Sequence, residues 1–266
     1  MSIPVSLTIA GSDSGGGAGI QADIKAMQAN GTFAASVITA ITAQNTVAVT
    51  DAFELPVSLI RSQLDAVMSD LPVKAAKTGM LSSIAIIEAV SEGIRDHSIF
   101  PLVVDPVMIS KSGFSLLQDD AVEALTQGML PLATVCTPNA HEAGRLVGGA
   151  IQTEEDAREA ARAIQAMGPE SVLVKGGHLD EEVDAVDVLF DGSEFHVFRS
   201  KRVDTPHTHG TGCTYAASIA ARLAHGDTVA DAVARAHDYV HQAILGGLAI
   251  GKGHGPTDHF WFLREK

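Results

Sequence analysis

Five consecutive residues, His209-Gly210-Thr211-Gly212-Cys213, combine a permissive backbone with a thiol. Glycines let a backbone approach a ligand closely, and the small residues that follow predict a helix whose first amides have no partner within the helix. Amides in that position bind phosphoryl groups. A helix N-terminus also lowers the pKa of a cysteine, so we expect Cys213 to line an anion site and to accept a proton there. The same sequence would also form a glycine turn followed by a buried cysteine. This motif alone does not distinguish such a turn from an anion site.

A second glycine-rich segment follows an apolar run that predicts a strand, and it reads Ala10-Gly11-Ser12-Asp13-Ser14-Gly15-Gly16-Gly17-Ala18-Gly19. Its spacing breaks the Gly-x-Gly-x-x-Gly pattern of dinucleotide sites, because Ile20 stands where the last glycine is required. Three consecutive glycines lose much conformational entropy on folding, which is worthwhile where a backbone must approach a ligand. The segment therefore predicts a binding loop for a small polar ligand, in preference to a merely flexible turn.

A single lysine, Lys175, ends the apolar run Val172-Leu173-Val174. A lysine buried at the end of a strand is costly unless it meets an anion. We therefore expect Lys175 to bind a phosphate group.

The charge balance of the chain limits its partners. Of the 266 residues 46% are hydrophobic and 19% are charged, which is typical of a globular chain, and the net charge is −14. Nucleic acids and anionic lipid surfaces attract clusters of Lys and Arg, so this charge argues against both as partners. A phosphate site in such a chain needs local help from helix N-termini, a few lysines and a divalent metal.

The cysteine count and the N-terminus bear on the compartment. Two cysteines give no disulfide framework, and no Cys or His spacing typical of a metal motif is present. No apolar run approaches the roughly 18 residues that span a bilayer, and the first residues lack the layout of a signal peptide. We expect a soluble, cytoplasmic protein with no membrane partner.

Short apolar runs rich in Val, Ile and Thr alternate with longer segments of helical period, which predicts a parallel sheet with crossover helices. The expected strands are Val5–Gly11, Ala35–Ala43, Lys74–Met80, Leu102–Met108, Thr134–Asn139 and Ser171–Gly176. The expected helices are Ala18–Asn30, Val57–Ser69, Ser82–His97, Asp119–Met129, Glu154–Met167, Gly212–Ala224 and Val229–Leu245. Ligands of doubly wound sheets bind beyond the carboxyl ends of the strands, so the site is expected there.

Two short alternating segments, Val186–Phe190 and Phe195–Phe198, flank the turn Asp191-Gly192-Ser193. This pattern predicts an antiparallel hairpin at one edge of the sheet. The sequence contains no linker, internal repeat or low-complexity segment, so residues 1–266 are expected to form one α/β domain.

Seven motifs taken together resemble the hydroxymethylpyrimidine/phosphomethylpyrimidine kinases of thiamine biosynthesis, in the ribokinase-like superfamily. They are the glycine-rich segment continued to Asp23, Thr39-Ala40-Ile41-Thr42-Ala43-Gln44-Asn45-Thr46, Lys77-Thr78-Gly79-Met80-Leu81, Asp105-Pro106-Val107-Met108, Thr137-Pro138-Asn139, Lys175-Gly176-Gly177-His178 and the run from His209 to Cys213. The resemblance implies a ribokinase-like fold, with a mostly parallel central sheet flanked by helices on both faces. It also implies that ATP and Mg²⁺ serve to phosphorylate 4-amino-5-hydroxymethyl-2-methylpyrimidine and then its monophosphate.

The resemblance assigns the pyrimidine ring to Gln44, whose amide can pair with a ring nitrogen and an exocyclic amine together. Four further positions match residues that line the pocket of the ring: Gly11, Asp23, Met80 and Val107. An apolar wall with a few oriented polar groups suits a small aromatic ring.

The nucleotide side is assigned in the same way. The resemblance places Lys175, Thr211, Gly212 and Asn139 at the nucleotide and its phosphates. Asn139 and Glu142 match an Asn-x-x-Glu pair that organises magnesium and its waters, although a helix cap followed by an acid has the same letters. Asp105 matches a residue on the metal side, also through waters.

Much of the superfamily has an aspartate as base at the position of Cys213. The resemblance implies that Cys213 is the base here and that the amides of Gly210, Thr211, Gly212 and Cys213 form the anion hole for the transition state. Phosphoryl transfer depends mainly on positioning and charge neutralisation, so the base contributes only part of the rate.

The second phosphorylation adds a phosphate to the acceptor, and local cations must offset its charge. Lys111 and His209 are candidates, whereas His207 is expected at the solvated surface.

Two other functions stay open at this stage. Some pyridoxal kinases share the Gly-Thr-Gly-Cys variant, so a pyridoxal kinase or a kinase of both rings is the nearest alternative. A ligand-binding module or a transferase with Cys213 as nucleophile belongs to another class and predicts no ATP turnover. The family also suggests a homodimer.

Overall fold

The computed structural model describes residues 3–109, 116–118, 120–177 and 184–264. In this part of the chain one nine-stranded sheet runs in the order β3-β2-β1-β4-β5-β6-β7-β8-β9. The strands from β2 to β7 are parallel, while β3 at one edge and the β8–β9 hairpin at the other are antiparallel to their neighbours. The strands are β1 (Val5–Asp13), β2 (Phe33–Gln44), β3 (Val49–Glu54), β4 (Val73–Thr78), β5 (Leu102–Val104), β6 (Val135–Cys136), β7 (Ser171–Val174), β8 (Asp184–Phe190) and β9 (Phe195–Lys201).

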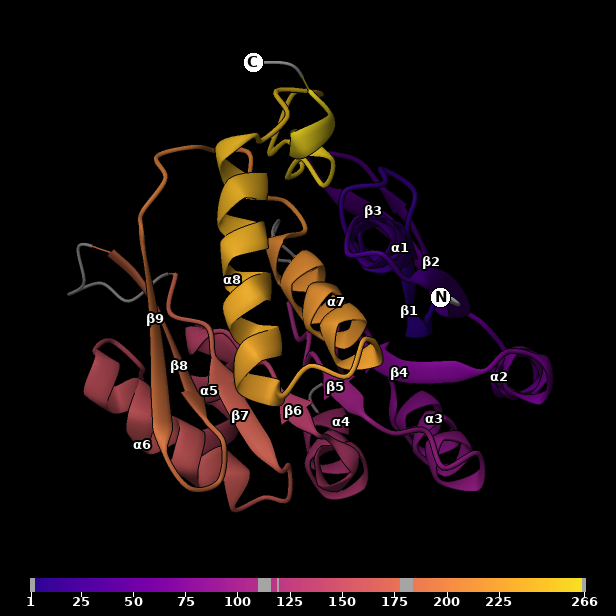
Figure 1. The fold of residues 1–266 in the computed structure, drawn as a ribbon. Helices are drawn as coiled ribbons and strands as arrows, with labels where there is room; N and C mark the ends of the chain where they lie inside the picture. Colours follow the sequence, from indigo (N-terminus) through magenta and orange to yellow (C-terminus); the bar gives the residue numbers. More distant parts are fainter. Residues whose placement is uncertain (1–2, 110–115, 119, 178–183, 265–266) are drawn as a thin grey trace.

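Helices cover both faces of the sheet (Figure 1). One face carries α1 (Gly19–Ala29), α7 (Thr211–Ala224) and α8 (Val229–Leu245), which share a buried cluster with the strands. The other face carries α2 (Val57–Asp70), α3 (Ile84–Asp96), α4 (Ala121–Ala124), α5 (Ala140–Val147) and α6 (Glu154–Gln165). The expected architecture, a mostly parallel sheet between two helical layers with an edge hairpin, is confirmed.

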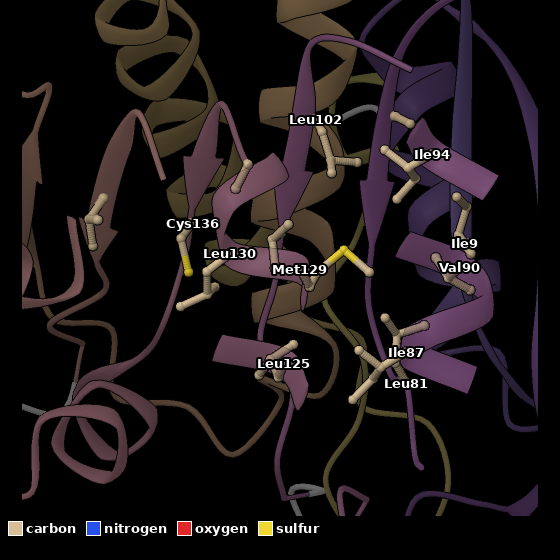
Figure 2. Packing of buried hydrophobic residues seen from close by; sticks show 14 of the residues in the cluster. Ile9, Leu81, Ile87, Val90, Ile94, Leu102, Leu125, Met129, Leu130 and Cys136 are labelled. Carbon is tan, nitrogen blue, oxygen red and sulfur yellow. The ribbon is translucent and has the colours of Figure 1, made fainter. Parts of the chain in front are cut away.

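The strands alternate their side chains between these two layers. Along β7, Val172 and Val174 belong to the cluster under α2 to α6, whereas Leu173 belongs to the cluster under α1, α7 and α8. Figure 2 shows part of the first cluster, in which Cys136 of β6 lies near Leu130. Cys136 has no exposed surface, and burial raises the pKa of its thiol, so the prediction that this cysteine belongs to the core is confirmed.

Three elements differ from the sequence prediction. The edge strand β3 was not expected, because five of its six residues are exposed and leave no alternating apolar signal. The helix α5 was not expected either, because it is short. The helix predicted over Asp119–Met129 is instead a short α4 followed by a π-helical turn (Leu125–Met129) and a 3₁₀ turn (Leu130–Leu132), and Asp119 lies outside the described residues.

None of the helices in the described ranges is both long and apolar enough to cross a membrane. The parallel strands all end at the same edge of the sheet, where the loop after β1, the end of β2 and the start of α7 come together. The fold therefore gathers the polar residues of several motifs at one place.

Candidate active site

A cavity of about 730 Å³ opens at this edge of the sheet. Almost all of the predicted site residues line it: Gly11, Gln44, Met80, Asp105, Val107, Asn139, Glu142, Lys175, Gly210, Thr211, Gly212 and Cys213. Residues scattered over two hundred positions of sequence thus share one wall, as expected for a doubly wound sheet.

One end of the cavity has the composition expected for an aromatic ring. Met80 packs against Gly11 so closely that a Cβ atom at position 11 would lie 3.1 Å from its sulfur. Val107 and Gln44 line the same cavity. Apolar atoms and one oriented amide suit a small heteroaromatic ligand.

Asp23 departs from the prediction, because it lies beneath the cavity wall and not on it. Its two carboxylate oxygens accept from Nζ of Lys77 at 2.9 and 2.8 Å, and Thr8 donates to one of them at 2.6 Å. Asp23 and Lys77 are both fully buried. With all these partners inside the protein, Asp23 supports the wall through Lys77 instead of touching a ligand.

The glycine-rich loop after β1 is folded around Asp13. Its carboxylate accepts hydrogen bonds from the amides of Gly15 (2.8 Å), Gly17 (3.1 Å) and Ala18 (2.8 Å), and it lies 3.0 Å from Nε2 of His209. Burial acts to raise the pKa of Asp13, but hydrogen bonds from His209, Ala18 and Gly15 outweigh it and hold that pKa below its ordinary value. Asp13 is therefore an ionised acceptor that ties this loop to the start of α7.

Lys175 and Asp105 form the centre of the cavity. Nζ of Lys175 donates to Oδ1 of Asp105 at 2.8 Å, and the hydroxyl of Thr137 lies 3.2 Å from the same oxygen. Burial acts to lower the pKa of Lys175, yet Asp105 and Glu142 hold it above its ordinary value. The lysine therefore stays charged at the cavity surface, as the prediction of a phosphate-binding lysine requires.

Asn139 and Glu142 form a capping box at the start of α5. The side chain of Asn139 accepts from the amide of Glu142 at 2.9 Å, and a carboxylate oxygen of Glu142 accepts from the amide of Asn139 at 2.8 Å. Burial raises the pKa of Glu142 to about 7, with Lys175 acting against this shift and Asp105 adding to it. The Asn-x-x-Glu pattern therefore forms a helix cap, and both residues also border the cavity.

The start of α7 brings the anion motif to the lysine. Gly210 caps the helix with a φ of 80°, and a Cβ atom added at Gly212 would lie 3.4 Å from Nζ of Lys175. The amide of Thr211 already donates to the carbonyl of Thr208 at 3.3 Å. The next two amides of the first turn, those of Gly212 and Cys213, are therefore the ones that an anion beside Lys175 can use.

Cys213 does not have the lowered pKa that its place on the helix predicts. Burial raises the pKa of its thiol to about 11, although Lys77 acts to lower it. Desolvation of the thiolate outweighs the helix and the lysine, so Cys213 is a protonated thiol at neutral pH.

The opposite end of the cavity was not assigned from the sequence. It is lined by the end of β9, by the residues after it and by one face of α8, among them Lys201, Val203, Thr205, His237, Val240 and Ile244. Asp187 bonds Nδ1 of His237 at 2.9 Å, and this contact raises the pKa of His237 although burial acts to lower it. These residues carry no motif of their own, and only the packing of α8 against the hairpin brings them to the cavity.

Two of the cation candidates can now be placed. His209 is buried at the ring end, while His207 is half-buried against Gly247 and Gly255, contrary to the expected solvated position. Lys111 and His178 lie outside the described residues.

The phosphomethylpyrimidine kinase family model matches residues 13–258, and a hydroxymethylpyrimidine/phosphomethylpyrimidine kinase of Streptomyces coelicolor is 52% identical over 98% of this chain and 96% of its own. The chain belongs to the phosphomethylpyrimidine kinase family. It is a kinase with a ribokinase-like fold. A crystal structure of phosphomethylpyrimidine kinase from Clostridium difficile is 44% identical, with a TM-score of 0.81 over 91% of this chain and 100% of that one. An ADP complex of Bacillus subtilis pyridoxal kinase is 38% identical, with a TM-score of 0.92 over 98% of this chain and 99% of that one.

The central charges suit a divalent cation. Asp105 and Glu142 are both buried and share one lysine, so this part of the cavity has an excess of negative charge that a nucleotide alone would increase. Among the described residues no three His, Cys, Asp or Glu side chains are grouped to hold a metal by themselves. Bound magnesium commonly keeps several waters and is coordinated by one or two carboxylates together with phosphate oxygens. Asp105 and Glu142 supply carboxylates suited to this coordination.

Proposed function

We propose that this kinase phosphorylates the hydroxymethyl group of 4-amino-5-hydroxymethyl-2-methylpyrimidine and then the resulting monophosphate, with ATP as donor. The observation that carries the proposal is a single cavity that is lined by Gln44, Met80 and Val107 and also by Lys175 and the start of α7. The family of the chain and its relative in Streptomyces coelicolor support the same reaction.

The roles of the site residues follow from their positions. Gln44 binds the polar edge of the ring, and Gly11, Met80 and Val107 pack on its faces. Lys175 and the amides of Gly212 and Cys213 neutralise the transferred phosphoryl group, where charge develops in the transition state. The nucleotide is placed in the remaining volume beside β9 and α8, and the ADP complex of the pyridoxal kinase supports the binding of an adenine nucleotide by this fold.

Magnesium is the proposed metal. Asp105 and Glu142 would hold it through waters, with Asn139 beside them, and it would neutralise the nucleotide phosphates. Lys175 keeps Asp105 in place and supplies the positive charge that belongs to the protein itself.

Cys213 is the proposed base, with a modest contribution. Its pKa of about 11 leaves only a minor thiolate fraction to accept a proton at neutral pH, and a loose transition state for phosphoryl transfer needs little help in removing the proton of the acceptor. Positioning and charge neutralisation carry most of the rate.

The enzyme is further proposed to be one kinase domain over residues 1–266, to act in the cytoplasm and to form a homodimer. Its cysteines, Cys136 and Cys213, are both free, which fits a reducing compartment. The net charge of −14 argues against nucleic acids as partners.

The test is ATP consumption with magnesium on the hydroxymethylpyrimidine, its monophosphate and pyridoxal in parallel, with products identified by mass. Formation of the mono- and diphosphate of the pyrimidine is the expected result. Turnover of pyridoxal alone would make the enzyme a pyridoxal kinase, and turnover of none of the three would refute the proposal.

A variant separates the two ends of the cavity. Gln44→Ala is expected to weaken binding of the pyrimidine more than binding of ATP, because the amide lies at the ring end. Equal losses on pyridoxal and on the pyrimidine in this variant would contradict the assigned specificity.

A further inference from the structure

The amide of Gln44 lies between two polar side chains. Its carbonyl oxygen is 3.1 Å from the hydroxyl of Thr42, and its nitrogen is 3.3 Å from Nε2 of His209. Oxygen and nitrogen of a glutamine amide are assigned from their hydrogen-bond partners, since the two atoms have almost the same shape. The partners on each side can therefore be examined for what they accept and donate.

On one side, His209 must donate. Its Nε2 lies 3.0 Å from Oδ2 of Asp13, an ionised carboxylate that accepts only. Nε2 therefore carries a hydrogen, and an imidazole nitrogen that carries a hydrogen cannot accept one from an amide NH₂. The atom of Gln44 that faces His209 has to be the oxygen, which shares the single Nε2 hydrogen with Asp13 in a three-centre contact.

On the other side, Thr42 must accept. Its hydroxyl has one hydrogen, and the carbonyl oxygen of Ser12, 3.0 Å away, can only accept it. The Thr42 oxygen then has only its lone pairs left, and lone pairs accept hydrogen bonds. The group of Gln44 that faces Thr42 therefore has to be a donor, which is the NH₂ group. Two independent sets of partners thus require the same exchange of the amide oxygen and nitrogen.

We propose that His209 and Thr42 are positioning residues that determine ring specificity by fixing the Gln44 amide with its oxygen towards His209 and its nitrogen towards Thr42. This inference rests on the proposed function, because it takes Gln44 as the group that binds the ring. It adds the direction in which that amide is held and names the residues that hold it.

The support for His209 is rigid. The ring is packed over Gly17, where a Cβ atom would collide with Cδ2 of the imidazole. The backbone of His209 is held on both sides by the segment near the C-terminus, since its amide donates to the carbonyl of Gly255 and its carbonyl accepts from the amide of Thr257. An imidazole fixed by Asp13, by Gly17 and by its own backbone has one direction for its Nε2–H bond.

The loop that follows Gln44 is held by the same segment. The hydroxyl of Thr46 accepts from the amides of Lys252 and Gly253 at 3.2 Å, and the amide of His254 donates to the carbonyl of Thr46 at 2.9 Å. Gln44 and His209 therefore keep their relative positions without a ligand, and the amide is oriented before the ring arrives.

A fixed amide recognises one pattern of polar atoms. After its contacts with His209 and Thr42, the amide of Gln44 still has a lone pair on its oxygen and an N–H on its nitrogen. These bind a ring that offers a donor next to an acceptor, such as an exocyclic amine beside an unprotonated ring nitrogen. A 4-oxo ring offers the reverse pattern, an acceptor beside a ring N–H, and it could bind only if the amide turned over and gave up both supporting contacts.

The test compares two rings that differ only in this pattern: 4-amino-5-hydroxymethyl-2-methylpyrimidine and its 4-oxo counterpart. Dissociation constants of both are measured by calorimetry for the wild type, His209→Leu, Thr42→Val and the double variant. Thr42→Ser, which keeps the hydroxyl, is the matched control, and binding of ADP at the other end of the cavity checks that each variant is folded.

The wild type is expected to prefer the amino ring by about a hundredfold or more, as bidentate polar recognition usually does. Each single variant should lower this preference by about tenfold, the effect of one hydrogen bond, and the double variant should lower it further. Thr42→Ser should keep it. A merely structural role would weaken both rings equally and leave their ratio unchanged.

An unchanged ratio in Thr42→Val and in His209→Leu would overturn this inference while leaving the proposed function intact. If His209→Leu lost ADP binding, Thr42→Val and its serine control would decide alone. Failure of the wild type to bind the amino ring would overturn the proposed function itself, and this inference with it.

Discussion

Two lysine–aspartate pairs lie side by side at the carboxyl edge of the sheet, and only one of them serves the cavity. Lys77 donates to both oxygens of Asp23, which also accepts from Thr8, and neither charged side chain has any exposed surface. Lys175 donates to one oxygen of Asp105, and its side chain remains 11% exposed at the cavity.

The two pairs differ in the charge and the hydrogen-bond donors that remain available to a ligand. The pair of Lys77 and Asp23 is fully buried and neutral as a unit, and although Lys77 borders the cavity, its charge is already paired with both oxygens of Asp23. Lys175 shares its charge with Asp105 and Glu142 and keeps hydrogens free for an anion. The same two residue types therefore stabilise the fold in one place and are available for catalysis in the other.

The largest expected effect is a loss of stability when the buried pair of Lys77 and Asp23 is broken. Lys77→Met should lower the free energy of unfolding by about 3 to 5 kcal/mol, because it leaves the carboxylate of Asp23 buried without a counter-charge. Urea denaturation measures the loss. Lys74→Met is the matched control on the same strand, since Lys74 is exposed. The double variant Lys77→Met with Asp23→Leu should regain most of the stability. If Lys77→Met alone were as stable as the wild type, Lys77 would not be needed to neutralise the buried carboxylate of Asp23.

The cavity pair should respond in rate instead. Lys175→Met is expected to lower kcat by about a hundredfold to a thousandfold, the usual cost of removing one group that stabilises transition-state charge. Its melting temperature should change less than that of Lys77→Met, because water can reach Asp105 once the lysine is gone. Steady-state kinetics and thermal unfolding on the same preparations give both values. A variant whose melting temperature falls as far as that of Lys77→Met while its kcat is unchanged would reverse the comparison.

Cys213 lies within the electrostatic influence of both lysines and should show a smaller effect. Cys213→Ser is expected to lower kcat by about tenfold to a hundredfold, at or below the lower end of what a general base contributes.

The state of this thiol can be measured separately. With a pKa of about 11, Cys213 should react slowly with iodoacetamide at neutral pH and faster as the pH rises towards 11. The buried Cys136 is the internal control, because it should not react in the folded protein. Fast alkylation of Cys213 at pH 7 would show a thiolate and would restore the prediction from the helix position.

The smallest effects compare the hydroxyls that support the two aspartates. Thr8→Val removes a donor 2.6 Å from Asp23 and should cost about 1 to 3 kcal/mol of unfolding free energy, because the carboxylate is sealed from water. Thr137→Val removes a contact of 3.2 Å to Asp105 and should cost about 1 kcal/mol or less. Urea denaturation measures the loss of unfolding free energy in both variants. Equal losses would mean that Asp23 and Asp105 are equally shielded from water.

The sequence predicted the layers and most of the cavity wall for physical reasons that can be named. Long segments with a clear helical period, such as α6 and α8, and apolar runs such as β7 report directly on burial. Motifs that end strands predicted the cavity residues because parallel strands finish at one edge.

Other features depend on tertiary contacts that no local pattern records. The exposed edge strand β3 has no apolar face to reveal it. The seal over Asp23 comes from Lys77, fifty-four residues away in sequence, and the high pKa of Cys213 comes from desolvation in the folded protein. His237 reaches the cavity only because α8 packs on the hairpin.

The contact between Gly17 and Gly210 separates two tasks of the enzyme. A Cβ atom at Gly210 would collide with the carbonyl oxygen of Gly17, so the loop after β1 and the start of α7 meet main chain against main chain. The spacing between the loop after β1 and the start of α7 is thereby fixed by a backbone contact, in addition to the contact between Asp13 and His209. Substitutions near Gln44 can change which ring is accepted without altering the path of transfer. One such scaffold can serve vitamins of different ring chemistry, which accords with a pyridoxal kinase whose fold superposes on this chain with a TM-score of 0.92.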